Sequence, residues 1–184
     1  MKFTFLILLI LLFGKASNAQ EDYADGYYIT YGGDTIHAKI KVLNSKAGKK
    51  IGYLNPKGRK RKFSASQVKE YQIKGFAGYA SIAPYPKAPK VRFFADIAVE
   101  GQARLLYYGF KKKYYLNRKG TTEAIKIKKL SFRKQLMHFF QDFDELREDL
   151  KKKRLKYGQI ETAVTRYNTW YVEFYLPYQH SLKK

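Results

Sequence analysis

Apolar and polar side chains alternate between residues 91 and 99, and this alternation constrains the fold more than any other feature of the sequence. The apolar positions are Val91, Phe93, Ala95, Ile97 and Val99. Arg92 and Asp96 fall between them, so the pattern predicts a strand with one buried face and one face in water. Glycines at turn positions divide residues 100–116 into two further strands, and a three-stranded meander is therefore expected here.

Similar strand signals occur on both sides of this meander. Residues 22–43 combine strand-forming aromatic and β-branched residues with a Gly-Gly-Asp turn, which predicts a hairpin. Shorter strands are expected at residues 51–54, 63–76 and 122–127. Three prolines make residues 83–90 an irregular connector. An antiparallel meander of about seven or eight strands is therefore predicted for this part of the chain.

From Ser131 onward the apolar spacing becomes that of helices. Apolar residues recur three and four positions apart in three groups, at residues 132–140, 143–150 and 160–171. Pro177 is expected to end the third helix. Strands followed by helices predict an α+β fold, in which a C-terminal three-helix segment packs on the antiparallel β-sheet. One domain is expected at residues 20–184, with residues 20–128 mainly β and residues 129–176 mainly α.

Residues 1–19 have the properties of a cleaved signal peptide. Lys2 precedes an apolar run at residues 3–13, which is shorter than the ~20 residues needed to cross a bilayer. Ser17 and Ala19 place small side chains where signal peptidase requires them. We expect export with cleavage after Ala19, to the periplasm, the outer membrane or the extracellular space. An uncleaved anchor helix is the alternative, and no transmembrane segment is expected in the mature chain.

The chain is strongly basic, with 37 Lys and Arg residues against 15 Asp and Glu, and it contains no cysteine. The excess is concentrated in residues 44–75 and 111–156. Exposed positive charge attracts anions over a Debye length of ~8–10 Å, so lipid headgroups, lipopolysaccharide or an acidic protein are the expected partners. The candidate anion-contacting residues are Lys57, Arg59, Lys60, Arg61, Lys62, Lys111, Lys112 and Lys113. The alternative is a solvated basic surface without a specific partner.

No catalytic, cofactor-binding or metal-binding residues are predicted, and no cofactor is expected. The imidazoles of the chain are His37, His138 and His180, and Asp142 follows His138 at a helical spacing. Two ligands are too few for a metal site. The acids at residues 142–145 suit helix capping better than general acid–base catalysis. We expect a non-enzymatic protein, with a small envelope hydrolase as the alternative.

Two aromatic segments leave further alternatives open. Lysine and tyrosine alternate at residues 113–115, a pattern that can stack nucleic-acid bases. Nucleic acid is not the expected partner, because the chain is expected to be exported and carries no known nucleic-acid motif. The aromatic tail at residues 170–178 is compatible with a membrane interface, although packing of the third helix on the sheet is the preferred interpretation.

Residues 26–40 read Gly-Tyr-Tyr-Ile-Thr-Tyr-Gly-Gly-Asp-Thr-Ile-His-Ala-Lys-Ile. This segment resembles the opening of a group of small secreted envelope proteins of Gram-negative bacteria, whose mature chains begin with a G-x-I-x-x-x-G-D-T-I-x-G-x-I hairpin. Leu106-Tyr107 and Tyr167-Asn168 resemble a strand motif and a helical-tail motif of that group, whereas Ala38 stands where the group usually has glycine. The resemblance implies an exported protein with a small sheet and a helical tail. The group has no assigned activity, so the resemblance implies no chemistry.

Overall fold

The computed structural model describes residues 23–42, 50–76, 78–85 and 92–181. The expected signal peptide and Val91 lie outside the described residues. Ten strands form one sheet, in the order β10-β9-β8-β7-β6-β5-β1-β2-β3-β4. The strands are β1 (Tyr23–Thr30), β2 (Thr35–Lys41), β3 (Lys50–Leu54), β4 (Lys60–Ser64), β5 (Val68–Ile73), β6 (Gly78–Tyr85), β7 (Phe93–Val99), β8 (Ala103–Tyr108), β9 (Lys113–Arg118) and β10 (Glu123–Lys126).

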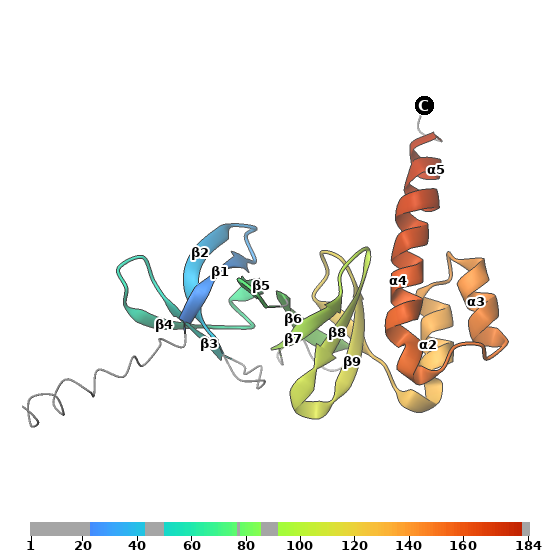
Figure 1. Ribbon diagram of the computed structural model, residues 1–184, viewed down its shortest axis with the longest axis horizontal. Coiled ribbons are helices and arrows are strands. Elements are labelled where there is room, and N and C mark those ends of the chain that lie inside the picture. The colour runs from blue at the N-terminus through green and yellow to red at the C-terminus, as the bar shows by residue number, and fades with distance from the viewer. Residues whose placement is uncertain (1–22, 43–49, 77, 86–91, 182–184) are drawn as a thin grey trace, which may run out of the picture.

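Three parts follow one another along the long axis of the molecule (Figure 1). A curved sheet of β1–β5 lies at one end, a barrel of β6–β10 lies in the middle, and helices lie at the other end. The helical elements are α2 (Phe132–Phe139), α3 (Asp144–Lys151), α4 (Ile160–Trp170) and α5 (Leu176–Ser181), with short 3₁₀ turns η1 (Gly109–Lys111), η2 (Lys129–Ser131) and η3 (Tyr157–Gln159) and a π-helical segment, η4 (Tyr171–Tyr175). The predicted α+β class with C-terminal helices is therefore confirmed.

The prediction of a simple antiparallel meander of seven or eight strands is wrong. β10 pairs antiparallel with β9 and parallel with β6, which closes β6–β10 into a five-stranded barrel. β6 includes Pro84 and Tyr85, at the start of the segment that its prolines led us to expect as an irregular connector. The pairing of Ala124 with Pro84 joins residues 40 positions apart, and such a pairing leaves no mark on the local hydrophobic pattern.

Each part has its own core. The barrel interior receives a buried apolar side chain from every one of its five strands, and Ala95 of β7, Leu106 of β8 and Ala124 of β10 are fully buried there. The curved sheet packs around Ile40, Ile51 and neighbouring aromatic side chains. The helices cover the outer face of the barrel. In that layer the largest core cluster joins side chains of β8, β9, α2, α3 and α4.

The alternation in residues 91–99 is only partly confirmed. Phe93 and Ala95 point into the barrel, and Ile97 packs against the same cluster. Phe94, on the face expected to be wet, is fully buried, because the outer side of β7 covers the core of the curved sheet. Val99, predicted on the same buried face as Phe93 and Ala95, instead packs toward the helices, because a bulge between Ile97 and Val99 shifts the register of β7 against β8.

The third helix does not end at Pro177. α4, η4 and α5 form one continuous helical rod, and its α5 end projects beyond the rest of the described chain (Figure 1). Proline lacks the N–H that an α-helical bond to the residue four positions earlier would require. The preceding residues are π-helical, with Leu176 N–H bonded to the carbonyl of Tyr171, and Pro177 is the second residue of α5. The helical rod therefore contains Pro177, and the turn directly before this proline is a wider π turn.

Asp96 gives a testable consequence of this packing. It is half-buried on β7 and pairs across the sheet with Tyr79 of β6. Burial raises the pKa of the Asp96 carboxyl above its ordinary value of 3.8, so the fold disfavours its ionised form. The stability associated with this group is therefore fully present below pH 3.8 and decreases as the pH rises through the folded-state pKa.

We expect Asp96→Asn to stabilise the protein against urea at neutral pH. The gain should shrink toward zero below pH 3.8, where the carboxyl is protonated in both the folded and the unfolded states. Urea unfolding of both proteins across the acidic range measures this difference. An Asn variant that is less stable than the wild type at neutral pH would contradict this assignment.

Candidate functional site

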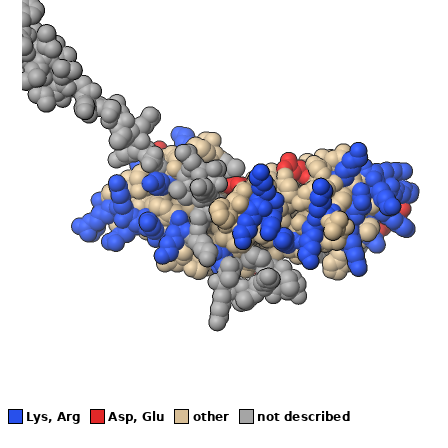
Figure 2. Space-filling view, turned by 90° about the horizontal axis from the view of Figure 1, so that it is seen from below, with Lys and Arg blue, Asp and Glu red and all other residues tan. Residues whose placement is uncertain are grey.

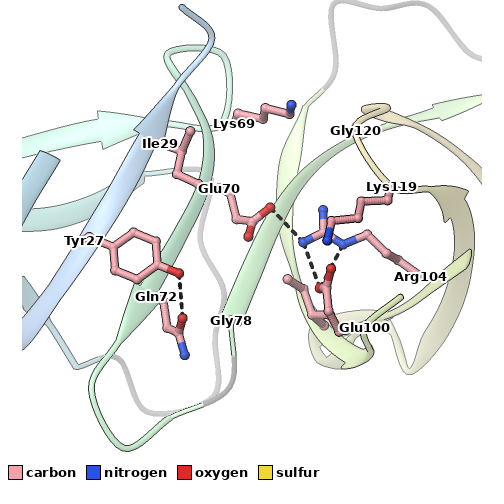
Figure 3. A pocket seen from close by; sticks show the side chains of 11 residues that line it. Tyr27, Ile29, Lys69, Glu70, Gln72, Gly78, Glu100, Arg104, Lys119 and Gly120 are labelled. Atoms are coloured by element: carbon pink, nitrogen blue, oxygen red, sulfur yellow. Dashed lines mark hydrogen bonds and ion pairs between the residues drawn. The ribbon is translucent and has the colours of Figure 1, made fainter. Parts of the chain in front are cut away.

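A hollow of about 520 Å³ lies where the curved sheet meets the barrel (Figure 3). β1 contributes Tyr27, β5 contributes Glu70, and Arg104 of β8 reaches toward them from the barrel. Lys69 and Lys119 also line the hollow. Two carboxylates and three cationic side chains thus surround a space that is large enough for a small ligand.

Arg104 lines this hollow and joins the two carboxylates on its wall. β8 places Ala103 and Leu105 toward the helices, so Arg104 faces the barrel side, where its side chain is only 6% exposed. Its Nη2 donates to Glu70 Oε2 over 2.8 Å, and its Nε donates to Glu100 Oε2 over 3.0 Å. Burial lowers the pKa of the Arg104 guanidinium, but the hydrogen bonds and charges of Glu70 and Glu100 outweigh burial and hold this pKa above its ordinary value.

This geometry suits a clamp between two parts of the fold. Glu70 belongs to β5 of the curved sheet, whereas Arg104 and Glu100 belong to the barrel and its β7–β8 turn. Both carboxylates are bound to one guanidinium, so each already serves as its counterion.

The predicted basic residues 57–62 lie on the β3–β4 hairpin. The Asn55 side chain fixes the turn, because its Oδ1 accepts hydrogen bonds from the backbone N–H groups of Lys57 and Arg59. Lys57, Arg59, Lys60, Arg61 and Lys62 are all exposed. β4 is the last strand in the sheet order, and charged side chains on such an edge also prevent pairing with other chains.

The predicted basic residues 111–113 lie at the tip of the β8–β9 hairpin. Lys111 and Lys112 are exposed and Lys113 is half-buried. Because β8 and β9 are near the opposite end of the sheet order from β4, the structure does not bring the two groups of predicted residues together. Figure 2 shows Lys and Arg side chains along the full length of one face of the molecule, with few acidic side chains among them.

Sequence reasoning missed three residues beside this tip. The backbone N–H of Ile127 bonds to the carbonyl of Tyr114, so the chain after Ile127 runs beside Lys113. Lys128, Lys129 and Leu130 follow there, and all three are exposed. No local pattern could have joined residues 111–113 to residues 128–130, because their proximity results from the pairing of β9 with β10.

The side chains considered for metal binding and catalysis include His37, His138, Asp142, Asp144 and Glu145, whereas the side chain of His180 lies outside the described residues. Within the described residues, no three His, Asp or Glu side chains gather as a metal site would require. Asp144 pairs with Arg147 over 2.8 Å, and Glu145 pairs with Arg166 over 2.9 Å. The expected capping of α3 by an Asp side chain is wrong, because Phe143 is the N-cap residue and makes no side-chain cap bond.

The aromatic tail divides into a packed part and an exposed part. Tyr167 is fully buried in the core cluster that the helices share with β8 and β9, whereas Trp170 stacks not on the sheet but on Phe143 before α3, with ring centroids 4.7 Å apart. Phe174 and Tyr178, farther along the rod, are 63% and 60% exposed. In the part of the chain that the structure describes, no helix has the length and apolar character needed to cross a membrane.

Comparisons of the chain with protein-family models, with curated proteins and with solved structures found no match.

Proposed function

We propose that this protein is an exported, non-enzymatic protein of the cell envelope that attaches through its basic surface to anionic partners. These partners are lipid headgroups, lipopolysaccharide or an acidic protein. The location follows from the signal-peptide properties of residues 1–19. The attachment follows from the distribution of charge over the described surface.

The observation that supports attachment most strongly is that the predicted basic residues form no ion pair with the acids of the described part of the chain. Within the described residues, acids form ion pairs with cationic side chains that include Arg104, Arg118, Arg147, Lys151, Lys152, Arg154 and Arg166. None of the eight candidate anion-contacting residues, at positions 57, 59–62 and 111–113, forms an ion pair with another described residue. Their charges are therefore available to an external anion.

The alternatives receive less support from the described residues. A hydrolase would need a free acid or base in the hollow, whereas Glu70 and Glu100 are both bound to Arg104. Base stacking would need open tyrosine faces at residues 114 and 115. Tyr115 is 5% exposed and lies in the barrel interior, and Tyr114 donates a hydrogen bond to Glu161.

Binding to anionic surfaces is expected to be strong at low salt and to weaken steeply as salt rises. Screening shortens the reach of exposed charges, from ~30 Å at 0.01 M salt to ~3 Å at 1 M. Cosedimentation with vesicles of phosphatidylglycerol, with lipopolysaccharide and with phosphatidylcholine across this range measures the effect. Binding that is equal on neutral and anionic vesicles, or that does not respond to salt, would contradict the proposal.

A further inference from the structure

We propose that one end of the barrel is the face with which this protein docks onto an anionic lipid bilayer. This face, the barrel tip, consists of Phe110, Lys111, Lys112, Lys113, Lys128, Lys129 and Leu130. The inference rests on the proposed function and narrows it to one surface and one class of partner.

The barrel tip is built from two segments at the same end of the barrel. Residues 110–113 close the β8–β9 hairpin, and residues 128–130 form the turn before α2. The pairing of Lys126 with Tyr115 and the bond between Ile127 N–H and Tyr114 O bring the second segment alongside the first. Both segments lie at the lower edge of the molecule in Figure 1.

Each segment presents an exposed apolar side chain among lysines. Phe110 is 63% exposed and Leu130 is completely exposed, at 104%. Within the described residues, none of the five lysines of the barrel tip forms an ion pair. The nearby acid Glu161 accepts a hydrogen bond from Tyr114. Lysines attract the headgroups of an anionic bilayer, while apolar side chains enter the boundary between headgroups and acyl chains.

The local structure holds both apolar side chains outward. Phe110 lies beside Tyr108, with ring centroids 6.1 Å apart, and Lys112 closes the hairpin with a left-handed backbone at φ 48°. Gln135 of α2 fixes the second segment, because its Oε1 accepts a bond from Lys128 N–H and its Nε2 donates to the Lys126 carbonyl. Leu130 is therefore exposed in a turn whose backbone is held by hydrogen bonds of Gln135 with Lys126 and Lys128.

Two other exposed surfaces lack this combination. The β3–β4 hairpin carries five basic residues at positions 57–62, and none of the exposed large apolar side chains lies between them. The far end of the helical rod has exposed Val172, Phe174 and Tyr178, but Glu173 is the charged residue among them. Charge and apolar side chains coincide at the barrel tip, and a bilayer with anionic headgroups is the partner that fits both.

The test measures binding to vesicles of phosphatidylglycerol and phosphatidylcholine in equal amounts, with protein purified after export. We expect Lys111→Gln/Lys112→Gln/Lys129→Gln to bind about a hundredfold more weakly, since each lysine near an anionic surface contributes a factor of about five. Phe110→Ser/Leu130→Ser should bind roughly tenfold more weakly, because the inserted apolar area is lost. Thermal unfolding should be unchanged in both variants, because the replaced side chains are exposed.

Matched controls carry the same chemical changes elsewhere. Arg59→Gln/Lys60→Gln/Arg61→Gln removes three charges from the β3–β4 hairpin, and Val172→Ser/Phe174→Ser removes two exposed apolar side chains from the rod. Both should bind within a few-fold of the wild type. Since the chain has no cysteine, Leu130→Cys and Phe174→Cys can each carry an environment-sensitive dye. The dye at residue 130 should report an apolar environment on vesicles, and the dye at residue 174 should not.

The outcomes separate the inference from the proposed function. If the wild type binds anionic vesicles but both barrel-tip variants bind equally well, the docking face is elsewhere and only this inference fails. If the wild type binds neither anionic vesicles nor lipopolysaccharide at low salt, and captures no acidic protein, the proposed function itself fails. Weaker binding of the lysine variant with an unchanged Phe110→Ser/Leu130→Ser variant would overturn the insertion of apolar side chains into the bilayer.

Discussion

Replacing Arg104 with methionine is expected to lower the free energy of unfolding by about 3–5 kcal/mol, the cost of removing one partner from a buried ion pair. The Arg104 side chain is 6% exposed and that of Glu70 is 19% exposed, so the substitution would leave the largely buried Glu70 carboxylate without the guanidinium that it pairs with. The hydrogen bond between Arg104 of β8 and Glu70 of β5 would also be lost. Denaturation in urea, followed by circular dichroism, measures the change.

Two further variants separate this effect from the loss of a positive charge. Lys119→Met removes the same charge at the rim of the same hollow, and we expect it to change stability by less than ~0.5 kcal/mol. The double variant Arg104→Met/Glu70→Met should recover much of the loss, because no unpaired buried charge then remains. A loss below ~1 kcal/mol for Arg104→Met alone would show that Arg104 does not clamp the two parts together.

The clamp itself could not have been predicted from the sequence. The sequence shows that Arg104 lies between Ala103 and Leu105 in a strand. Strand alternation therefore places its charged side chain on the face that Ala103 and Leu105 do not occupy. Its partner Glu70 is 34 residues earlier in the chain. Only the packing of the curved sheet against the barrel brings the two together, and no local periodicity encodes that packing.

The strand pattern at residues 91–99 was only partly correct for the same reason, since packing between distant segments is not encoded in local periodicity. Period-two alternation correctly placed Phe93 and Ala95 in a core, since side chains of a strand alternate between its faces wherever the strand is regular. The pattern could not indicate that Phe94 would be covered by a second sheet, nor that a bulge would turn Val99 toward the helices. Both depend on tertiary contacts.

The basic residues show what composition can and cannot locate. Lys111 and Lys112 were predicted from their run of charge, and the structure places them in the open at a hairpin tip. Leu130 was missed, because in sequence it reads as an ordinary apolar residue at the start of the helical segment. It is fully exposed, and the pairing of β10 with β9 places it at the same end of the barrel as these lysines.

Replacing Asn168 with alanine is expected to lower the free energy of unfolding by about 2–4 kcal/mol, because it removes several hydrogen bonds at a partly buried site. Asn168 of α4 joins the helix to the β7–β8 turn. Its Oδ1 accepts from Ala103 N–H over 2.8 Å, and its Nδ2 donates to the carbonyls of Ala103 and Glu100 over 2.9 and 3.3 Å. Ala103 is fully buried, so its N–H would lose its partner without gaining water.

Thr169→Ala is the matched control, because Thr169 is the next residue of α4 and is exposed, and it should change stability by less than ~0.5 kcal/mol.

Gly101 provides a second check. Its φ of +153° favours glycine, and a Cβ there would lie 2.3 Å from Asn168 Cγ, so Gly101→Ala should also destabilise the protein. Combined with Asn168→Ala, which removes the side chain that the new Cβ would meet, the loss should be smaller than the sum of the two single losses. Additive losses in urea denaturation would show that Asn168 and the β7–β8 turn are not coupled, and that the helix is held on the barrel by apolar packing alone.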